Sequence, residues 1–180
     1  IGGGTSEVAV ITLSGIAVSQ SVRVAGDAMN MAVQRYLRDV FRLEVGEITA
    51  ENVKKILGNA VPRPDSPRLE VSGKDLVEGA PKVITIGEGH IREALNECIQ
   101  VIVGAVLRTL ERTPPELAAD IHRNGLLMAG GGSLLRGLDQ RIARETRLKV
   151  FVDKEPLTTV LRGTAKAMLD RERYQPVFIN

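Results

Sequence analysis

Residues 125–139 read GLLMAGGGSLLRGLD, a short apolar run that three glycines end before a leucine-rich helical pattern begins. A second triplet, Gly2, Gly3 and Gly4, precedes Thr5 and an apolar run over 8–13. Glycine has no Cβ, so backbone N–H groups can approach an anion closely, and a helix N-terminus adds free donors. Each triplet therefore predicts either a phosphate or nucleotide contact or a simple tight turn. Neither triplet continues as a P-loop, and no G-x-G-x-x-G fingerprint is present.

The composition is that of an ordinary globular protein and excludes several classes. The 180 residues are 43% hydrophobic and 26% charged, with a net charge of +2. This balance argues against whole-chain disorder and against a nucleic-acid binder, which shows a stronger basic excess. The single cysteine, Cys98, excludes an internal disulfide. No apolar run could span a bilayer and no signal peptide is visible, so a reducing, cytosolic compartment is the default.

The remaining patterns predict an α/β chain. A hairpin is expected over 8–24, with a turn at Ser14-Gly15 and a buried face that includes Ile16. Helical spacing predicts helices over 27–41, 49–58, 88–113, 133–146 and 156–169, and short apolar runs predict strands at 68–72, 82–86, 125–129 and 150–152. Asp27 and Thr49 are expected as N-caps, and Thr113 to Glu116 reads as a capping box with proline at the first helical position.

Few side chains suggest chemistry beyond the glycine segments. Glu51 and Lys54 lie one helical turn apart and could contact the ribose and the adenine edge, or could form a surface ion pair of small worth. His90 and His122 are expected to be polar residues near helix ends, and Cys98 a small core residue. No Ser-His-Asp or Cys-His arrangement is present.

Taken together and in order, these segments resemble the C-terminal half of the MreB family, the bacterial actin homologues. The resemblance covers residues 1–170. The segments that carry it are IGGGTSEVAVI at 1–11, VAGD at 24–27, GEITAENVK at 46–54, TPPELAAD at 113–120, AGGGSLLRGLD at 129–139, PLT at 156–158 and GTAKA at 163–167. Because the chain starts at Ile1, without methionine and with no strand ahead of its glycines, we expect a fragment of a longer protein.

The resemblance implies the second half of an actin-like ATPase fold, of the ribonuclease H-like type. Residues 1–26 and 88–170 would form the larger subdomain, IIA, residues 27–87 would form the smaller subdomain, IIB, and residues 171–180 would be a tail. ATP and Mg²⁺ would occupy the cleft between the two halves of the protein.

The resemblance also assigns contacts to residues of this chain. Gly2, Gly3, Gly4 and Thr5 would form the phosphate loop, with Thr5 positioning the β- and γ-phosphates. Glu51, Asn52 and Lys54 would meet the ribose and adenine side, and Gly130, Gly131, Gly132 and Ser133 would meet adenosine and the α-phosphate. No metal ligand is assigned, since the family's aspartate before the position of Ile1 is absent here. The general base would lie in the missing half, so we expect this chain alone not to hydrolyse ATP.

The function implied is that of a filament-forming, cell-shape-determining protein that organises cell-wall elongation in rod-shaped bacteria. Expected partners are further copies of the protein and cell-wall elongation proteins such as RodZ. The expected location is the cytoplasm, at the inner face of the cell membrane, through parts outside this chain. A sugar or acetate kinase of the same superfold, or a chaperone-type ATPase, is the alternative.

Overall fold

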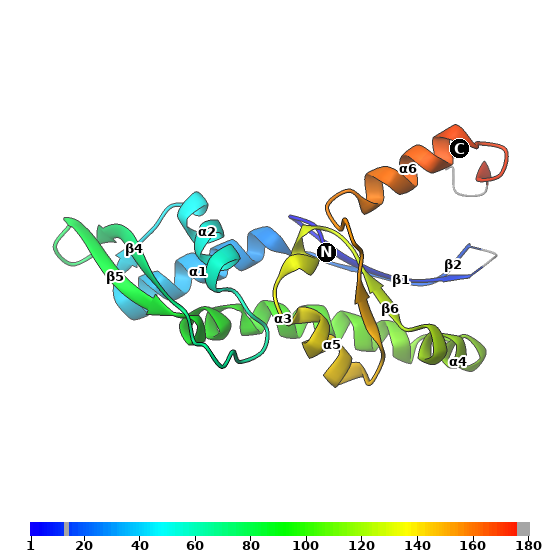
Figure 1. The fold of residues 1–180 in the computed structure, drawn as a ribbon, viewed down its shortest axis with the longest axis horizontal. Coiled ribbons are helices and arrows are strands. Elements are labelled where there is room, and N and C mark those ends of the chain that lie inside the picture. The colour runs from blue at the N-terminus through cyan, green and yellow to red at the C-terminus, as the bar shows by residue number, and fades with distance from the viewer. Residues whose placement is uncertain (13–14, 176–180) are drawn as a thin grey trace.

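A 24-residue helix, α3 (Glu88–Glu111), runs along the molecule and carries an element cluster at each end (Figure 1). The computed structural model describes residues 1–12 and 15–175. One end holds α1 (Gly26–Phe41), β3 (Leu43–Glu44), α2 (Glu47–Leu57), β4 (Arg68–Asp75) and β5 (Pro81–Gly87). The other end holds β1 (Ser6–Thr12), β2 (Gly15–Val22), α4 (Pro115–Asn124), β6 (Leu126–Met128), η1 (Gly131–Leu134), α5 (Leu138–Thr146) and β7 (Val150–Val152). The last helix, α6 (Thr159–Leu169), projects from the body and has no buried residue.

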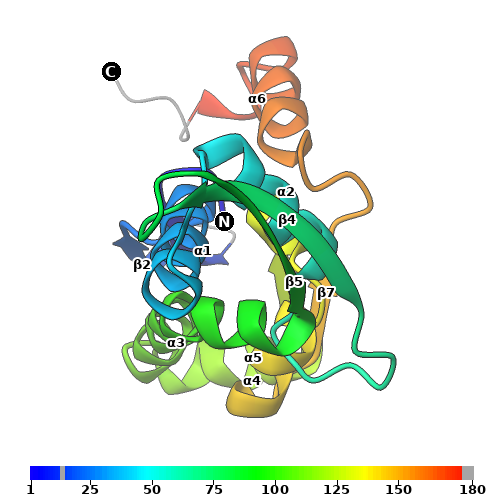
Figure 2. The ribbon, with the colours of Figure 1, turned by 90° about the vertical axis from the view of Figure 1, so that its left-hand side faces the viewer.

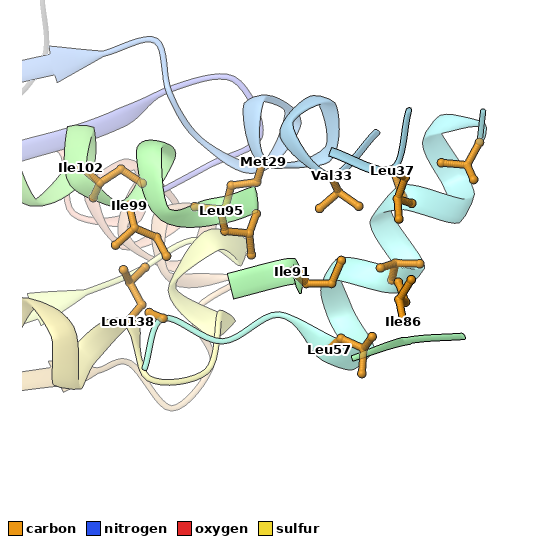
Figure 3. Packing of buried hydrophobic residues seen from close by; sticks show 14 of the residues in the cluster. Met29, Val33, Leu37, Leu57, Ile86, Ile91, Leu95, Ile99, Ile102 and Leu138 are labelled. Carbon is orange, nitrogen blue, oxygen red and sulfur yellow. The ribbon is translucent and has the colours of Figure 1, made fainter. Parts of the chain in front are cut away.

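Apolar positions on α3 connect the two clusters into one core (Figure 3). Ile91 and Leu95 pack in the region of α1 and α2, while Ile99 and Ile102 lie nearer Leu138 of α5. Spacings of three and four residues place these side chains on one helix face. The helix therefore fixes how the two element clusters sit relative to each other, and Figure 2 views the molecule from the end that holds β4 and β5.

The strands form three small sheets. β3, β4 and β5 make an antiparallel sheet in that order, β1 pairs antiparallel with β2, and β6 pairs parallel with β7. Within the described residues, β1 and β6 each have a partner on one edge only. Both strands line one groove of about 970 Å³, together with apolar residues of α3 and α4 such as Val106 and Ile121.

The predicted helices over 27–41 and 88–113 and the predicted strands near 68, 82 and 150 are confirmed, but the predicted caps are wrong. The N-caps of α1, α2 and α4 are Ala25, Gly46 and Pro114, and none makes a side-chain cap bond. Thr113 instead donates its hydroxyl to the Thr109 carbonyl at 2.7 Å, at the end of α3. That contact satisfies a carbonyl which the helix C-terminus would leave free.

The helix predicted over 133–146 is interrupted at Gly137, which has φ +70°. A Cβ at Gly137 would lie 2.6 Å from Asn59 Oδ1, so the chain passes too close to the 59–61 segment for any side chain. A 3₁₀ turn therefore precedes α5. The predicted burial of Ile16 is also wrong, since Ile16 is 67% exposed. Ser14, expected in the hairpin turn, lies outside the described residues.

We predict that Leu95→Ala lowers the free energy of unfolding of the chain by about 2–5 kcal/mol, because it removes a fully buried side chain and leaves a cavity. Denaturant unfolding followed by circular dichroism measures this. Leu161→Ala on α6 is the matched control, since Leu161 is 69% exposed and surface changes stay within about 0.5 kcal/mol. Equal effects of the two substitutions would contradict the assignment of the core to α3.

Candidate functional site

The two glycine segments lie side by side and are joined through Ile1. The Ile1 amine donates to the Ala129 carbonyl at 2.7 Å, and the Gly132 N–H donates to the Ile1 carbonyl at 3.0 Å. A Cβ at Gly130 would lie 2.3 Å from the Ile1 carbonyl oxygen, and one at Gly132 would lie 2.2 Å from Ile1 Cγ2. Glycine at both positions is therefore required for the contact. The convergence of the two segments, which the nucleotide hypothesis needs, is present.

The first segment is held by backbone hydrogen bonds on one side and is exposed on the other. The Gly2 N–H donates to the Thr5 carbonyl at 2.9 Å, while the carbonyls of Gly2 and Gly3 accept from the N–H groups of Gly26 and Asp27 at 3.1 and 2.9 Å. Within 1–12 and 15–175, the N–H groups of Gly3, Gly4 and Thr5 have no acceptor. Gly4 is exposed, and a Cβ there would meet nothing within 4 Å. The loop therefore presents backbone donors suited to an anion.

The second segment is more closed. Gly130 has φ +83°, and its N–H donates to the Pro156 carbonyl at 2.8 Å. Ser133 is buried, and its hydroxyl donates to the Gly130 carbonyl at 2.7 Å. That proton is therefore used within the protein, and the Ser133 contact with a ligand stays a prediction. Gly131 is the exposed member of the segment.

The predicted Glu51–Lys54 pair is not formed. Glu51 pairs with Lys55 at 2.9 Å, and this hydrogen bond and charge lower the pKa of the Glu51 carboxyl. Lys54 instead donates to the Gly26 carbonyl at 3.0 Å, directly behind the first glycine segment, and burial lowers the pKa of its ammonium group. Asn52 is exposed on α2, and its side chain makes no hydrogen bond among the described residues. Of the three α2 residues, Lys54 alone contacts Gly26, whose N–H donates to the Gly2 carbonyl of the first segment.

Asp27, which the sequence pattern predicts only as an N-cap, lies beside the first glycine segment. Its two carboxylate oxygens lie 3.4 Å from the position of a Cβ on Gly3. Asp27 directly follows Gly26, whose N–H donates to the Gly2 carbonyl, and the residue order alone does not reveal this long-range contact.

The site contains no preformed metal cluster among the described residues, where no group of three or more His, Cys, Asp or Glu side chains gathers. Within the same residues, none of the helices combines the length and apolarity needed to cross a bilayer. The site is therefore a set of backbone donors with one carboxylate and one ammonium group behind or beside them.

The fold and the joined glycine segments first define the structural class of the chain, which is the actin-like ATPase fold. MreB5 of Spiroplasma citri, solved bound to AMPPNP, matches with a TM-score of 0.92 at 35% identity, over 96% of this chain and 52% of that one. The fold class expected from the sequence is thereby confirmed.

The sequence then places the chain within that class. The profile of the family described as MreB/Mbl protein matches residues 1–176. Cell shape-determining protein MreB of Escherichia coli K12 is 46% identical over 168 residues, which are 93% of this chain and 48% of that protein. Cell shape-determining protein Mbl of Bacillus subtilis 168 is 42% identical over 170 residues, 94% and 51% respectively. The chain belongs to the MreB/Mbl family and spans about half the length of the curated relatives it matches.

We predict that Gly130→Ala destabilises the chain by about 1–3 kcal/mol, because alanine at φ +83° is strained and its Cβ would clash with the Ile1 carbonyl. Thermal or denaturant unfolding provides the measurement. Gly163→Ala on α6 serves as the control, since a Cβ there meets nothing within 4 Å and alanine favours the helix. A Gly130→Ala protein as stable as wild type would show that the joint with Ile1 does not form.

Proposed function

We propose that this chain is the second half of an ATP-binding, filament-forming protein that determines cell shape. The observation that carries the proposal is the pair of glycine segments joined through Ile1, with free N–H groups of Gly3, Gly4 and Thr5 on the open face. A row of backbone donors suits a polyphosphate. MreB5 of S. citri binds AMPPNP, and the E. coli relative is a cell shape-determining protein, which supports the same role here. Membership of the MreB/Mbl family favours this role over a metabolic kinase or a chaperone ATPase.

In the proposed complex, Gly2, Gly3, Gly4 and Thr5 hold the β- and γ-phosphates. The backbone of Gly130, Gly131 and Gly132, with Ser133 behind it, borders adenosine and the α-phosphate. Glu51 and Asn52 lie on the α2 side, where the resemblance places the ribose and adenine. Residues 1–26 with 88–170 form subdomain IIA in this proposal, and residues 27–87 form subdomain IIB.

Mg²⁺ fits this site as a partner of the phosphates rather than of a protein cage. Mg²⁺ is usually held by one or two carboxylates, by water and by substrate phosphates. Asp27, beside Gly3, is the carboxylate of this chain placed to contribute. When bound, the ion would neutralise phosphate charge that the Asp27 carboxylate would otherwise repel. The donor set therefore suits a nucleotide that binds as a complex with its metal ion.

Two surfaces of this chain are suited to bind the other half of the proposed protein. The groove between β1 and β6 exposes strand edges on both sides over an apolar floor, which suits one extended segment that pairs with both. Helix α6 presents large exposed apolar residues; those on it and in the turn before it are Leu157, Val160, Leu161, Met168 and Leu169. Both surfaces support the proposal that the nucleotide cleft is completed by a further part of the protein.

Self-association, contact with cell-wall elongation proteins such as RodZ, and a position at the inner face of the cell membrane are proposed for the complete protein. Phosphoryl transfer needs groups from both sides of the cleft. Hydrolysis would remove γ-phosphate contacts from Gly3, Gly4 and Thr5 and so shift the protein away from its assembly-competent arrangement.

We predict that the isolated 180-residue chain shows no appreciable Mg²⁺-dependent ATP hydrolysis, whereas the complete gene product forms polymers with ATP. Phosphate release measures the first and electron microscopy of samples with and without ATP measures the second. Turnover by the isolated chain would contradict the need for the second half. ATP-independent polymers would contradict the coupling of nucleotide to assembly.

We predict that Gly4→Asp in the complete protein lowers ATP affinity about tenfold or more. The added carboxylate would stand at the open loop, where a like charge a few ångströms from phosphate costs on the order of kcal/mol. Titration calorimetry measures the change. Gly46→Asp is the matched control, because a Cβ at Gly46 also meets open space and aspartate suits the N-cap of α2. Equal ATP affinities of the two variants would show that Gly4 is not part of the site.

A further inference from the structure

Two segments from different element clusters bind each other between α2 and α5. Residues 56–61 end α2 and follow it, whereas residues 135–137 connect η1 to α5. The Ala60 N–H donates to the Arg136 carbonyl at 2.8 Å, and Asn59 and Arg136 form an isolated parallel β-bridge. The Arg136 side chain donates from Nη1 to the Ile56 carbonyl at 2.7 Å. We call this contact between residues 56–61 and 135–137 the latch.

The latch is packed so closely that two of its positions have no room for a side chain. A Cβ on Gly137, where φ is +70°, would lie 2.6 Å from both Asn59 Oδ1 and Val61 Cγ2. A Cβ on Gly58 would lie 2.9 Å from Leu135 Cδ1. Asn59 is 4% exposed, and its Oδ1 atom accepts from the Val61 N–H at 3.2 Å, which holds the turn after α2. The two segments therefore meet backbone against backbone.

The Arg136 guanidinium also binds the end of α2. Ile56 lies in the last turn of α2, where carbonyl groups have no partner within the helix. A positive charge at this end is favourable toward the helix dipole as well. Arg136 is exposed, whereas Ala60 is buried, so the latch has a solvent-facing part and a buried part.

Along its own path, the chain connects the two clusters at two other places. It passes from β2 into α1, and it runs along α3 through both clusters. These two crossings alone would leave one rotation of the clusters against each other, about the line that joins the crossings. In Figure 3, Leu57 and Leu138, which flank the latch, lie across the core from Met29 near the start of α1. The latch is therefore away from the first crossing, where a contact opposes that rotation effectively.

We propose that the latch fixes the rotation of the cluster of α1, α2 and β3–β5 against the cluster that contains the second glycine segment. Ser133 of that segment is three residues from Arg136, so opening of the latch would change the separation between α2 and the second glycine segment. With the latch closed, the two clusters turn as one body. The inference goes beyond the proposed function and does not require a nucleotide, because it concerns contacts within this chain.

The first test separates the latch from backbone strain. Gly137→Ala and Gly79→Ala both place alanine at a φ near +70°, but a Cβ on Gly79 meets nothing within 4 Å. We expect Gly137→Ala to raise the hydrogen-exchange rate of the Ala60 amide about tenfold relative to the Leu95 amide of the core, because overpacking opens the contact that Ala60 makes. Gly79→Ala should leave this ratio unchanged. An unchanged ratio in Gly137→Ala would overturn the proposal.

The Arg136 side chain is tested by a substitution that adds no atom. Arg136→Ala should raise the same exchange ratio about fivefold, the worth of roughly one hydrogen bond. Arg144→Ala, which removes an exposed arginine of α5 outside the latch, is the control and should leave the ratio unchanged. Equal ratios in the two arginine variants would show that Arg136 does not hold the latch.

The second test asks whether the latch sets the rotation of the clusters or is only a local contact. Nitroxide labels are attached to the 180-residue chain through Ser72→Cys on β4 and Ser19→Cys on β2, which replace exposed serines in the two clusters. Cys98→Ser removes the native cysteine from the labelling reaction. Pulsed electron paramagnetic resonance then gives the distribution of distances between the clusters.

We expect Gly137→Ala and Arg136→Ala to broaden or shift this distribution, and Gly79→Ala to leave it as it is without the substitution. An unchanged distribution in a Gly137→Ala chain whose Ala60 amide exchanges faster would show a purely local contact and would overturn the proposal. If circular dichroism shows that Gly137→Ala does not fold, the Arg136→Ala chain decides the same question, and an unchanged distribution there overturns the proposal.

Discussion

The structure depends on a backbone contact that only glycine allows. Ile1 lies between the Ala129 carbonyl and the Gly132 N–H, two hydrogen bonds that join segments 128 positions apart. Neither Gly130 nor Gly132 has room for a Cβ at that joint. The contact fixes the first loop, the loop fixes the start of α1 through Gly26 and Asp27, and Gly26 receives Lys54 from α2. One continuous set of hydrogen bonds thus runs from the η1 segment to α2.

The chemistry of this network explains why the site has so few polar side chains. Backbone N–H groups are strong donors that are fixed in direction and lose no side-chain entropy when a ligand binds. The side chains that carry charge, Asp27 and Lys54, stand beside and behind the loop. Such an arrangement favours a ligand with several closely spaced oxygens, since together these oxygens can accept from all of the donors. In our proposal a nucleotide polyphosphate with its metal ion meets that condition.

Long apolar periodicity in the sequence predicted the elements well, and local polar signals predicted them poorly. The helix over 88–113 and the helix over 27–41 are present because their apolar faces bury core residues such as Leu95 and Val33. Asp27, Thr49 and Thr113 failed as caps since nothing local decides which contact a short polar side chain makes. Gly137 interrupts a helix because the chain passes close to Asn59, a neighbour that no local pattern reveals.

The site shows the same division between local and long-range information. The glycine triplets were visible as sequence, and their convergence followed only from the fold. The spacing of Glu51 and Lys54 suggested a pair, yet Lys55 lies equally close along the helix, and Gly26 offers Lys54 a less exposed partner.

From the exposed surfaces we infer that a bound ligand acts by closing the cleft between the two halves of the protein. In our proposal, β1, β6 and α6 meet the other half of the protein, and the nucleotide lies in the cleft between the two halves. We propose that this cleft has an open and a closed state in equilibrium. A ligand shifts that equilibrium only by the difference between its affinities for the two states. Phosphate oxygens that reach both the Gly4 N–H and a group of the opposite half bind the closed state alone, so they favour closure. Lys54 joins α2 to Gly26, and the N–H groups of Gly26 and Asp27 bind the first loop, so hydrogen bonds connect the loop that would meet phosphate to α2.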